Sequence, residues 1–309
     1  MTTTPPPAHD EDIARYAEAL GIPGLADIHV HFLPQSVLDK VWAFFDRAEA
    51  HYGRPWPIRY RYSTETRLKI LRSFGLQAIP ALTYPHKPGM AAWLNDWNAE
   101  FAAAHPDVIH CATLYAEPEA AQYVPAALAA GARLFKVHVQ VGEFAPDDPV
   151  LDPAWAALEE ATVPVVIHAG SDPLPGAHTG PGAVGRLLGR FPELRLVIAH
   201  MGMPEYQQFA DLAQEYSGVH LDTTMYVSGF FNSAADVPAG YRERLRTLQD
   251  KVVLGSDFPN IPYPYADQIS GLAELGLGDE WMRSVLWENG ARLMGLSGQH
   301  TTTPPQAGA

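Results

Sequence analysis

The chain is short of several kinds of residue, and each shortage excludes a class of protein. Cys111 is the only cysteine among 309 residues, so no disulfide can form within one chain. Lysine and arginine together number 21 against 35 acidic residues, which gives a formal net charge of −14. This balance argues against binding to nucleic acid or to an anionic membrane, because phosphate binding needs clustered basic residues.

Long hydrophobic runs are also missing. No stretch of about 18 apolar residues appears, so we expect no membrane span. The opening residues MTTTPPPAHDED have neither the basic region nor the apolar core of a signal peptide. Together with the single cysteine, this favours a cytoplasmic protein.

What the chain has instead is one long stretch without a linker. Residues 1–10 and 298–309 are rich in Thr, Pro, Gly and Ala, so we expect disordered tails there. Of all residues, 47% are hydrophobic, which is enough for a sizeable core. We expect residues 11–297 to form a single domain.

Short apolar segments alternate with amphipathic stretches along this domain. Such alternation is typical of an α/β protein with a parallel sheet, and eight units favour a (β/α)8 TIM barrel. An open doubly wound sheet is the alternative, but the first segment ends in HVHFLP without the glycine-rich turn of such folds. The expected strands are residues 25–31, 77–83, 108–115, 133–139, 163–168, 194–200, 218–223 and 252–257.

The connection after the first strand, residues 32–62, is unusually long. It contains a helical stretch at 36–50 and then the aromatic, proline-rich YGRPWPIRYRY. We interpret it as a lid-like insertion over the barrel mouth, since long loops in compact domains are often functional. A packed surface excursion is the alternative interpretation.

Ionisable residues occur on several predicted strands, most of them at the strand end. A single histidine in such a place is usually a hydrogen-bonded structural residue, but the carboxyl ends of barrel strands share one face. Burying several such groups unpaired is costly, and imidazole and carboxylate suit a divalent metal, above all Zn²⁺, with Mn²⁺, Fe²⁺ or Co²⁺ as other candidates. The residues are His29, His31, Lys136, His138, His168, His200 and Asp257.

Four of the motifs that carry these residues, DIHVH, VIHAG, IAHMG and GSDFP, resemble those of the amidohydrolase superfamily. The likeness is to the amidohydrolase-related (amidohydrolase-2) branch, which includes metal-dependent decarboxylases and TIM-barrel hydrolases. GARLFKVH, the PDDPVLDPAWAALEE that follows and ENGARLMGL are similar to that branch too. The resemblance covers residues 25–296.

The resemblance implies a metal at the carboxyl end of the barrel, held by His29, His31, His168 and Asp257. Asp257 would also handle protons, and His200 would polarise the substrate or move protons. The branch implies one ion, whereas other branches bridge two ions through a carboxylated lysine.

Lys136 offers a lysine in the place that a second ion would need, so the binuclear alternative stays open. If there is one ion, we expect Lys136 to bind substrate or support the site. His138 and His178 are expected in similar roles, and Asp27 is expected to support the ligands from below.

Two reactions are open for such a site. In the first, a metal-activated water attacks an amide, lactone or ester of a small aromatic or apolar molecule, Asp257 takes the proton and His200 stabilises the developing charge. In the second, the same residues serve the non-oxidative decarboxylation of an aromatic or unsaturated acid. A metal-holding barrel without catalysis is a third hypothesis. Barrels of this kind often form homodimers, although no feature of the sequence fixes the oligomeric state.

Overall fold

Parallel strands in chain order form the centre of the molecule. The computed structural model describes residues 4–296. A six-stranded parallel sheet runs through β3 (Cys111–Thr113), β4 (Leu134–His138), β5 (Val165–His168), β6 (Leu196–Ile198), β7 (Val219–Asp222) and β8 (Val252–Val253). A separate parallel pair joins β1 (Ile79–Pro80) to β2 (Val108–Ile109), and β2 and β3 are one stretch interrupted at His110.

Residues 25–31 close the ring between β8 and β1. The Ile28 N–H donates to the carbonyl of Leu254 at 2.9 Å, and the Val30 carbonyl accepts the N–H of Leu82 at 2.9 Å. The segment pairs through isolated parallel bridges, with Leu76 and Leu82 on one side and Phe258 on the other, instead of forming the regular strand that we expected. With this segment the strands make eight, which is the predicted (β/α)8 arrangement.

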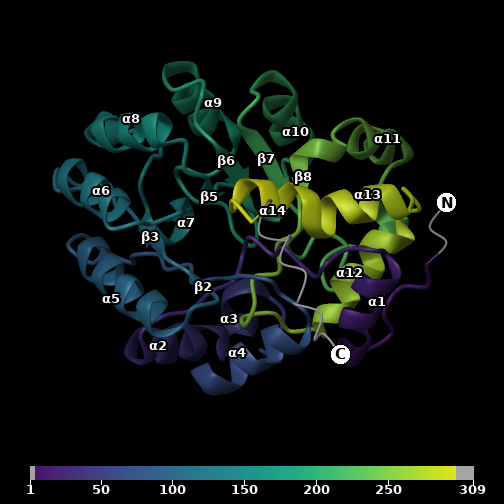
Figure 1. The fold of residues 1–309 in the computed structure, drawn as a ribbon. Helices are drawn as coiled ribbons and strands as arrows, with labels where there is room; N and C mark the ends of the chain where they lie inside the picture. The colour runs from purple at the N-terminus through teal and green to yellow at the C-terminus, as the bar shows by residue number, and fades with distance from the viewer. Residues whose placement is uncertain (1–3, 297–309) are drawn as a thin grey trace, which may run out of the picture.

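Helices surround the strands, and Figure 1 shows an outer ring that consists of α4, α5, α6, α8, α9, α10 and α11. Local signals mark several ends: Ser63 caps α4 by accepting the N–H of Thr66, and Pro181 occupies the first turn of α9. Within residues 4–296, no helix combines the length and apolar character that a membrane crossing requires. The α-helices are α1 (Ile13–Ala19), α2 (Gln35–Phe45), α3 (Ala48–Tyr52), α4 (Thr64–Ser73), α5 (Ala91–Ala104), α6 (Ala120–Ala129), α7 (Val139–Gly142), α8 (Asp152–Ala161), α9 (Pro181–Arg190), α10 (Tyr206–Glu215), α11 (Ala239–Thr247), α12 (Tyr265–Glu274), α13 (Asp279–Arg283) and α14 (Asn289–Leu293).

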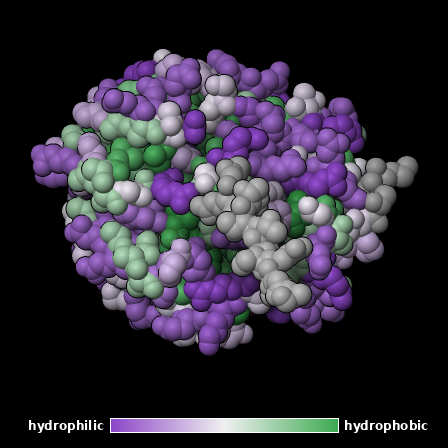
Figure 2. Space-filling model, in the orientation of Figure 1, coloured by the Kyte–Doolittle hydropathy of each residue, from purple (hydrophilic) through white to green (hydrophobic). Residues whose placement is uncertain are grey.

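The last helix, α14, covers the amino-terminal end of the barrel. Leu293 belongs to one apolar cluster with Ala26, near the start of the first segment, and with Val253 of β8. A side chain at Gly290 would place its Cβ 2.3 Å from the Ala26 carbonyl oxygen, so only glycine allows this approach. The face that carries α14 is largely hydrophilic (Figure 2). The opposite end of the barrel is thereby left for a functional site.

Residues 4–10 differ from the disordered tail that we expected. The Ser270 hydroxyl of α12 donates to the Pro7 carbonyl at 2.6 Å. The Asp10 carboxylate accepts the Ala266 N–H at 2.9 Å and also the Tyr60 hydroxyl. Individual polar contacts hold this segment, and they leave no sign in the sequence because they produce no periodic pattern of apolar residues. The other expected tail, residues 298–309, lies outside the described residues.

Candidate metal centre

His29 and His31 meet at the carboxyl end of the first barrel segment, as their spacing of two predicts. Their Nε2 atoms lie 3.1 Å apart. Asp257, which follows β8, has its Oδ1 3.0 Å from His31 Nε2 and 3.7 Å from His29 Nε2. Ligand atoms of the three residues all lie within 4.8 Å of one another. The arrangement is the right size to surround one cation.

Hydrogen bonds fix the tautomer of both imidazoles. His29 Nδ1 donates to Asp222 Oδ2 at 2.8 Å, and His31 Nδ1 donates to the Leu82 carbonyl at 3.1 Å. Burial lowers the pKa of His29, so that ring is neutral. Each Nε2 therefore carries a lone pair, and two lone pairs facing each other beside a carboxylate repel unless a cation lies between them. Imidazole and carboxylate donors fit a divalent metal.

Asp222, at the end of β7, is a part of the site that sequence reasoning missed. Its side chain is fully buried. Besides His29, it accepts the N–H of His200 at 2.8 Å and that of Thr224 at 3.0 Å. Burial alone would raise the pKa of Asp222, but the contacts with His29 lower it overall, so the group is an anion. The signal in the sequence was an acid at the end of a predicted strand, the same signal that pointed to Asp257.

A glycine makes the approach of Asp222 possible. A Cβ at Gly255 would lie 2.6 Å from Thr224 Oγ1, 2.9 Å from Asp222 Cγ and 3.0 Å from His29 Cβ. Any side chain at 255 would therefore displace Thr224, Asp222 or His29 from its position.

Lys136, on β4, reaches the same imidazole lone pair from the side of the barrel. Its Nζ lies 2.9 Å from His29 Nε2, and the side chain is buried. Burial lowers the pKa of Lys136 to about 8, even though Asp257 and Asp222 raise it. The amino group is close enough to contact whatever His29 binds.

His138 and His168 stack on each other at the ends of β4 and β5, where the sheet register pairs them. Their ring centroids are 4.1 Å apart. His168 Nε2 donates to the Asp172 carbonyl at 3.1 Å, which leaves a lone pair on Nδ1. His138 Nδ1 accepts the Val141 N–H at 3.3 Å, which leaves the proton on Nε2. Burial lowers the pKa of both rings, so both are neutral.

The stacked pair therefore offers one acceptor and one donor. His168 is not one of the three residues whose ligand atoms lie within 4.8 Å, and its role as a further ligand stays a prediction. His138 lines the cavity and carries an N–H donor.

His200 lies beside the same group, in the short helix η3 (Ala199–Gly202), with a left-handed backbone of φ 55°. Its ring centroid is 5.5 Å from that of His29 and 4.8 Å from that of His168. Burial lowers the pKa of His200 to about 4, so the ring is neutral at pH 7. The position agrees with the expected contact with substrate, which stays a prediction.

Two further predicted residues lie apart from the reacting groups. Asp27 is buried behind the centre, where it accepts the N–H groups of His29 at 3.0 Å and Ser256 at 3.1 Å and the Tyr265 hydroxyl at 2.8 Å. It thus ties the first segment to the turn that carries Asp257. His178 is half-buried and does not line the cavity, so the arrangement gives no support to a substrate role for it.

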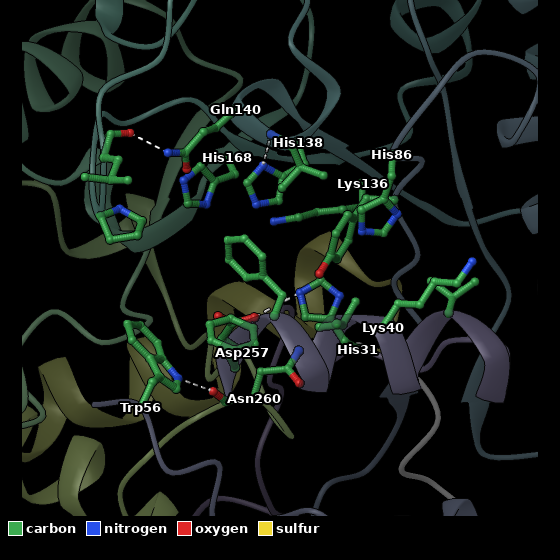
Figure 3. A pocket seen from close by; sticks show the side chains of 18 of the residues that line it. His31, Lys40, Trp56, His86, Lys136, His138, Gln140, His168, Asp257 and Asn260 are labelled. Carbon is green, nitrogen blue, oxygen red and sulfur yellow. Dashed lines mark hydrogen bonds and ion pairs between the residues drawn. The ribbon is translucent and has the colours of Figure 1, made fainter. Parts of the chain in front are cut away.

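The centre opens into a cavity of about 950 Å³ (Figure 3). The insertion after the first segment forms part of its wall through α2 and α3, with Val37, Val41 and Tyr52 among the lining residues. Trp56, from the same insertion, lies across the cavity from Lys40 and His86 in Figure 3. Its indole N–H donates to the Asn260 carbonyl at 2.7 Å.

A TIM barrel with a histidine pair on its first strand and an aspartate after its last, facing one cavity, defines a barrel protein of the amidohydrolase type. The chain belongs to the family described as Amidohydrolase, the amidohydrolase-2 branch, whose model matches residues 26–296. Its members include metal-dependent hydrolases and decarboxylases. No curated protein matches the sequence.

Solved structures share the fold. An uncharacterised TIM-barrel protein from Bordetella bronchiseptica matches with a TM-score of 0.71 and 20% identity, over 89% of this chain and 100% of that one. The 5-carboxyvanillate decarboxylase from Sphingomonas paucimobilis matches with a TM-score of 0.63 and 18% identity, over 88% and 99%. The decarboxylase of the same name from Novosphingobium aromaticivorans, complexed with manganese and 4-hydroxy-3-methoxy-5-nitrobenzoic acid, matches with a TM-score of 0.58 and 15% identity, over 87% and 99%. At these identities the likeness shows the fold.

Proposed function

We propose that the protein is a metal-dependent hydrolase that cleaves an amide, lactone or ester bond of an aromatic or apolar substrate. The observation that carries the proposal is the pair of Nε2 lone pairs, 3.1 Å apart, that face the carboxylate of Asp257. Membership of the amidohydrolase family supports the same reaction class.

One Zn²⁺ per chain is the proposed cofactor, held by His29, His31 and Asp257, with His168 Nδ1 as the fourth donor. Mn²⁺ is the second candidate, because a manganese complex occurs among the structural neighbours. Such an ion, when bound, supplies a Lewis acid and lowers the pKa of a bound water to about 7.

The chain's own groups supply the remaining functions of a hydrolase. Burial alone would raise the pKa of Asp257, but the contacts with His31 and the other neighbouring imidazoles lower it overall, so it is an anion that can accept the proton of the attacking water and pass it to the leaving group. His200 is neutral and lies beside His29, where it can stabilise negative charge on the substrate oxygen. His138 adds an N–H donor whose orientation is fixed before substrate binds.

Decarboxylation of an aromatic or unsaturated acid is the second candidate function. Lys136 and His138 favour it, because both present donors to the cavity from one strand, two residues apart, and can hold a carboxylate. The named decarboxylases among the structural neighbours point the same way. In this reaction Asp257 and His200 would handle protons at carbon.

Isotope labelling separates the two reactions. The Zn²⁺- or Mn²⁺-loaded protein is incubated with aryl esters, aryl lactones, anilides and aromatic carboxylic acids in ¹⁸O-labelled water, with the His31→Ala variant as control. Hydrolysis is expected to place ¹⁸O in a carboxylic acid product without gas release. Release of carbon dioxide from the acids, with no label incorporated, would replace the hydrolase proposal by the decarboxylase.

A further inference from the structure

Exposed hydrophobic side chains are concentrated at the mouth of the candidate site. Four large hydrophobic side chains are exposed among the described residues, and three of them line the cavity: Phe44 (40% exposed), Trp93 (46%) and Leu174 (43%). They come from α2, α5 and the loop after β5, so no single local structure explains their meeting. Exposed apolar patches of this kind mark binding sites.

Basic side chains lie among these apolar residues. Lys40, Arg47 and Lys87 are exposed and line the same cavity, and no ion pair within residues 4–296 involves them. Figure 3 shows Lys40 next to His86 on one side of the cavity. Three unpaired cations at one opening are notable in a chain with a net charge of −14.

Two acids besides Asp257 line the cavity, and they belong to another part of its wall. Glu143 and Asp172 come from the loops after β4 and β5, whereas the three basic residues come from the insertion after the first segment and the loop after β1. The wall is therefore positively charged on one side.

The cavity is also large for a one-ring substrate. Its volume of about 950 Å³ is near the upper end of the range for small-molecule sites, which extends to about 1,000 Å³. The metal ligands line one continuous space with the exposed apolar and basic residues, here called the rim (Phe44, Trp93, Leu174, Lys40, Arg47 and Lys87), so one molecule can contact both His31 and the rim.

We infer that the substrate is an elongated amphipathic anion. Its reacting group lies at His31 and Asp257, an apolar body of two rings or a comparable alkyl chain lies against Phe44 and Trp93, and an anionic group at the far end pairs with Lys40 and Lys87. The placement of the reacting group at His31 and Asp257 rests on the proposed function. The binding of the apolar body and the anionic group at the rim does not. A second copy of the chain is a less suitable occupant, because a protein surface cannot fill a deep cavity that leads to the barrel centre.

A fluorescent anion of this shape, 8-anilino-1-naphthalenesulfonate, tests the inference with the full-length protein. We expect one probe to bind per chain, more weakly as salt is added. The double variant Lys40→Gln/Lys87→Gln should weaken binding roughly tenfold, since exposed ion pairs contribute only modestly to affinity. Trp93→Ala should weaken binding by roughly tenfold or more, because the probe covers the exposed part of this large apolar side chain.

Two matched controls lie outside the cavity. Lys69→Gln removes an exposed cation of α4, and Tyr62→Ala removes the fourth exposed hydrophobic residue, and neither should change probe affinity. Equal affinity in the wild type and in all four variants would overturn the inference. So would size-exclusion data in which the wild type is a dimer and Trp93→Ala a monomer, because the rim would then be a contact between copies.

The titration is independent of the proposed reaction. It is repeated with His31→Ala after chelation, where we expect probe affinity close to that of the wild type. A protein that binds the probe at the rim but neither hydrolyses nor decarboxylates any acid derivative would reject the proposed function and leave the rim assignment standing.

Discussion

Replacing Asp222 with Asn should weaken metal binding strongly while leaving the fold intact. Asp222 Oδ1 accepts two backbone N–H groups, from His200 and Thr224, and these still need an oxygen in the variant. The new amide NH₂ must then face His29 Nδ1, which is 2.8 Å from Oδ2 in the wild type. Two donors cannot face each other, so the His29 proton moves to Nε2 and removes the lone pair that a metal would use.

The size of the effect follows from this tautomer change. Loss of a carboxylate that orients a metal-binding histidine weakens metal affinity by about 10–100-fold. Because the ligand lone pair itself is lost here, we expect the upper end, about a hundredfold, or about 2.7 kcal/mol. The free energy of unfolding should change little, since both backbone donors keep their acceptor.

Competition with a chromophoric chelator measures the Zn²⁺ affinity of the metal-free wild type and of Asp222→Asn. Asp236→Asn is the matched control: this exposed carboxylate accepts the Ser233 N–H and hydroxyl, each at 2.8 Å, and does not line the cavity. The control should bind Zn²⁺ like the wild type. A folded Asp222→Asn protein with an affinity within about twofold of the wild type would refute the tautomer argument.

Burial and close packing elsewhere lead to three more expected outcomes. Burial lowers the pKa of His220 to about 4, so the unfolded chain binds more protons than the folded protein between pH 6.5 and 4. The free energy of unfolding therefore decreases as the pH is lowered through this range, and His220→Leu should remove up to about 3 kcal/mol of that decrease in urea titrations. Burial raises the pKa of Cys111 to about 12, so a disulfide reagent at pH 8 should label the thiol only after unfolding, and rapid labelling of folded protein would contradict its burial. Gly255→Ala would place a Cβ 2.9 Å from Asp222 Cγ and should weaken Zn²⁺ binding at least about tenfold in the chelator assay, whereas unchanged affinity would mean that the site tolerates the displacement.

The barrel and most of its site residues were predictable because they follow simple periodicities. Alternating apolar segments and helices predicted the parallel ring, and a spacing of two placed His29 and His31 on one face. The ends of the predicted strands then indicated His138, His168 and His200, all of which line one cavity.

Other features depend on contacts that no local pattern encodes. The tautomers of His29 and His31 are set by Asp222, at the end of β7, and by the Leu82 carbonyl, which follows β1. His200 and Asp257 both have positive φ without being glycine, so local propensity gives no indication of how their side chains point. Residues 25–31 close the ring through hydrogen bonds to Leu82 on one side and Leu254 on the other, and such long-range partners cannot be read from the local sequence.

The metal content of the protein tests the central claim most directly. The wild type and the His29→Ala/His31→Ala variant are loaded with Zn²⁺, freed of excess metal by gel filtration and analysed for metal per chain, with circular dichroism to check the fold. We predict one equivalent in the wild type and none in the folded variant. A folded variant that keeps its metal, or a wild type that holds two equivalents or none, would contradict the mononuclear centre built on His29, His31 and Asp257.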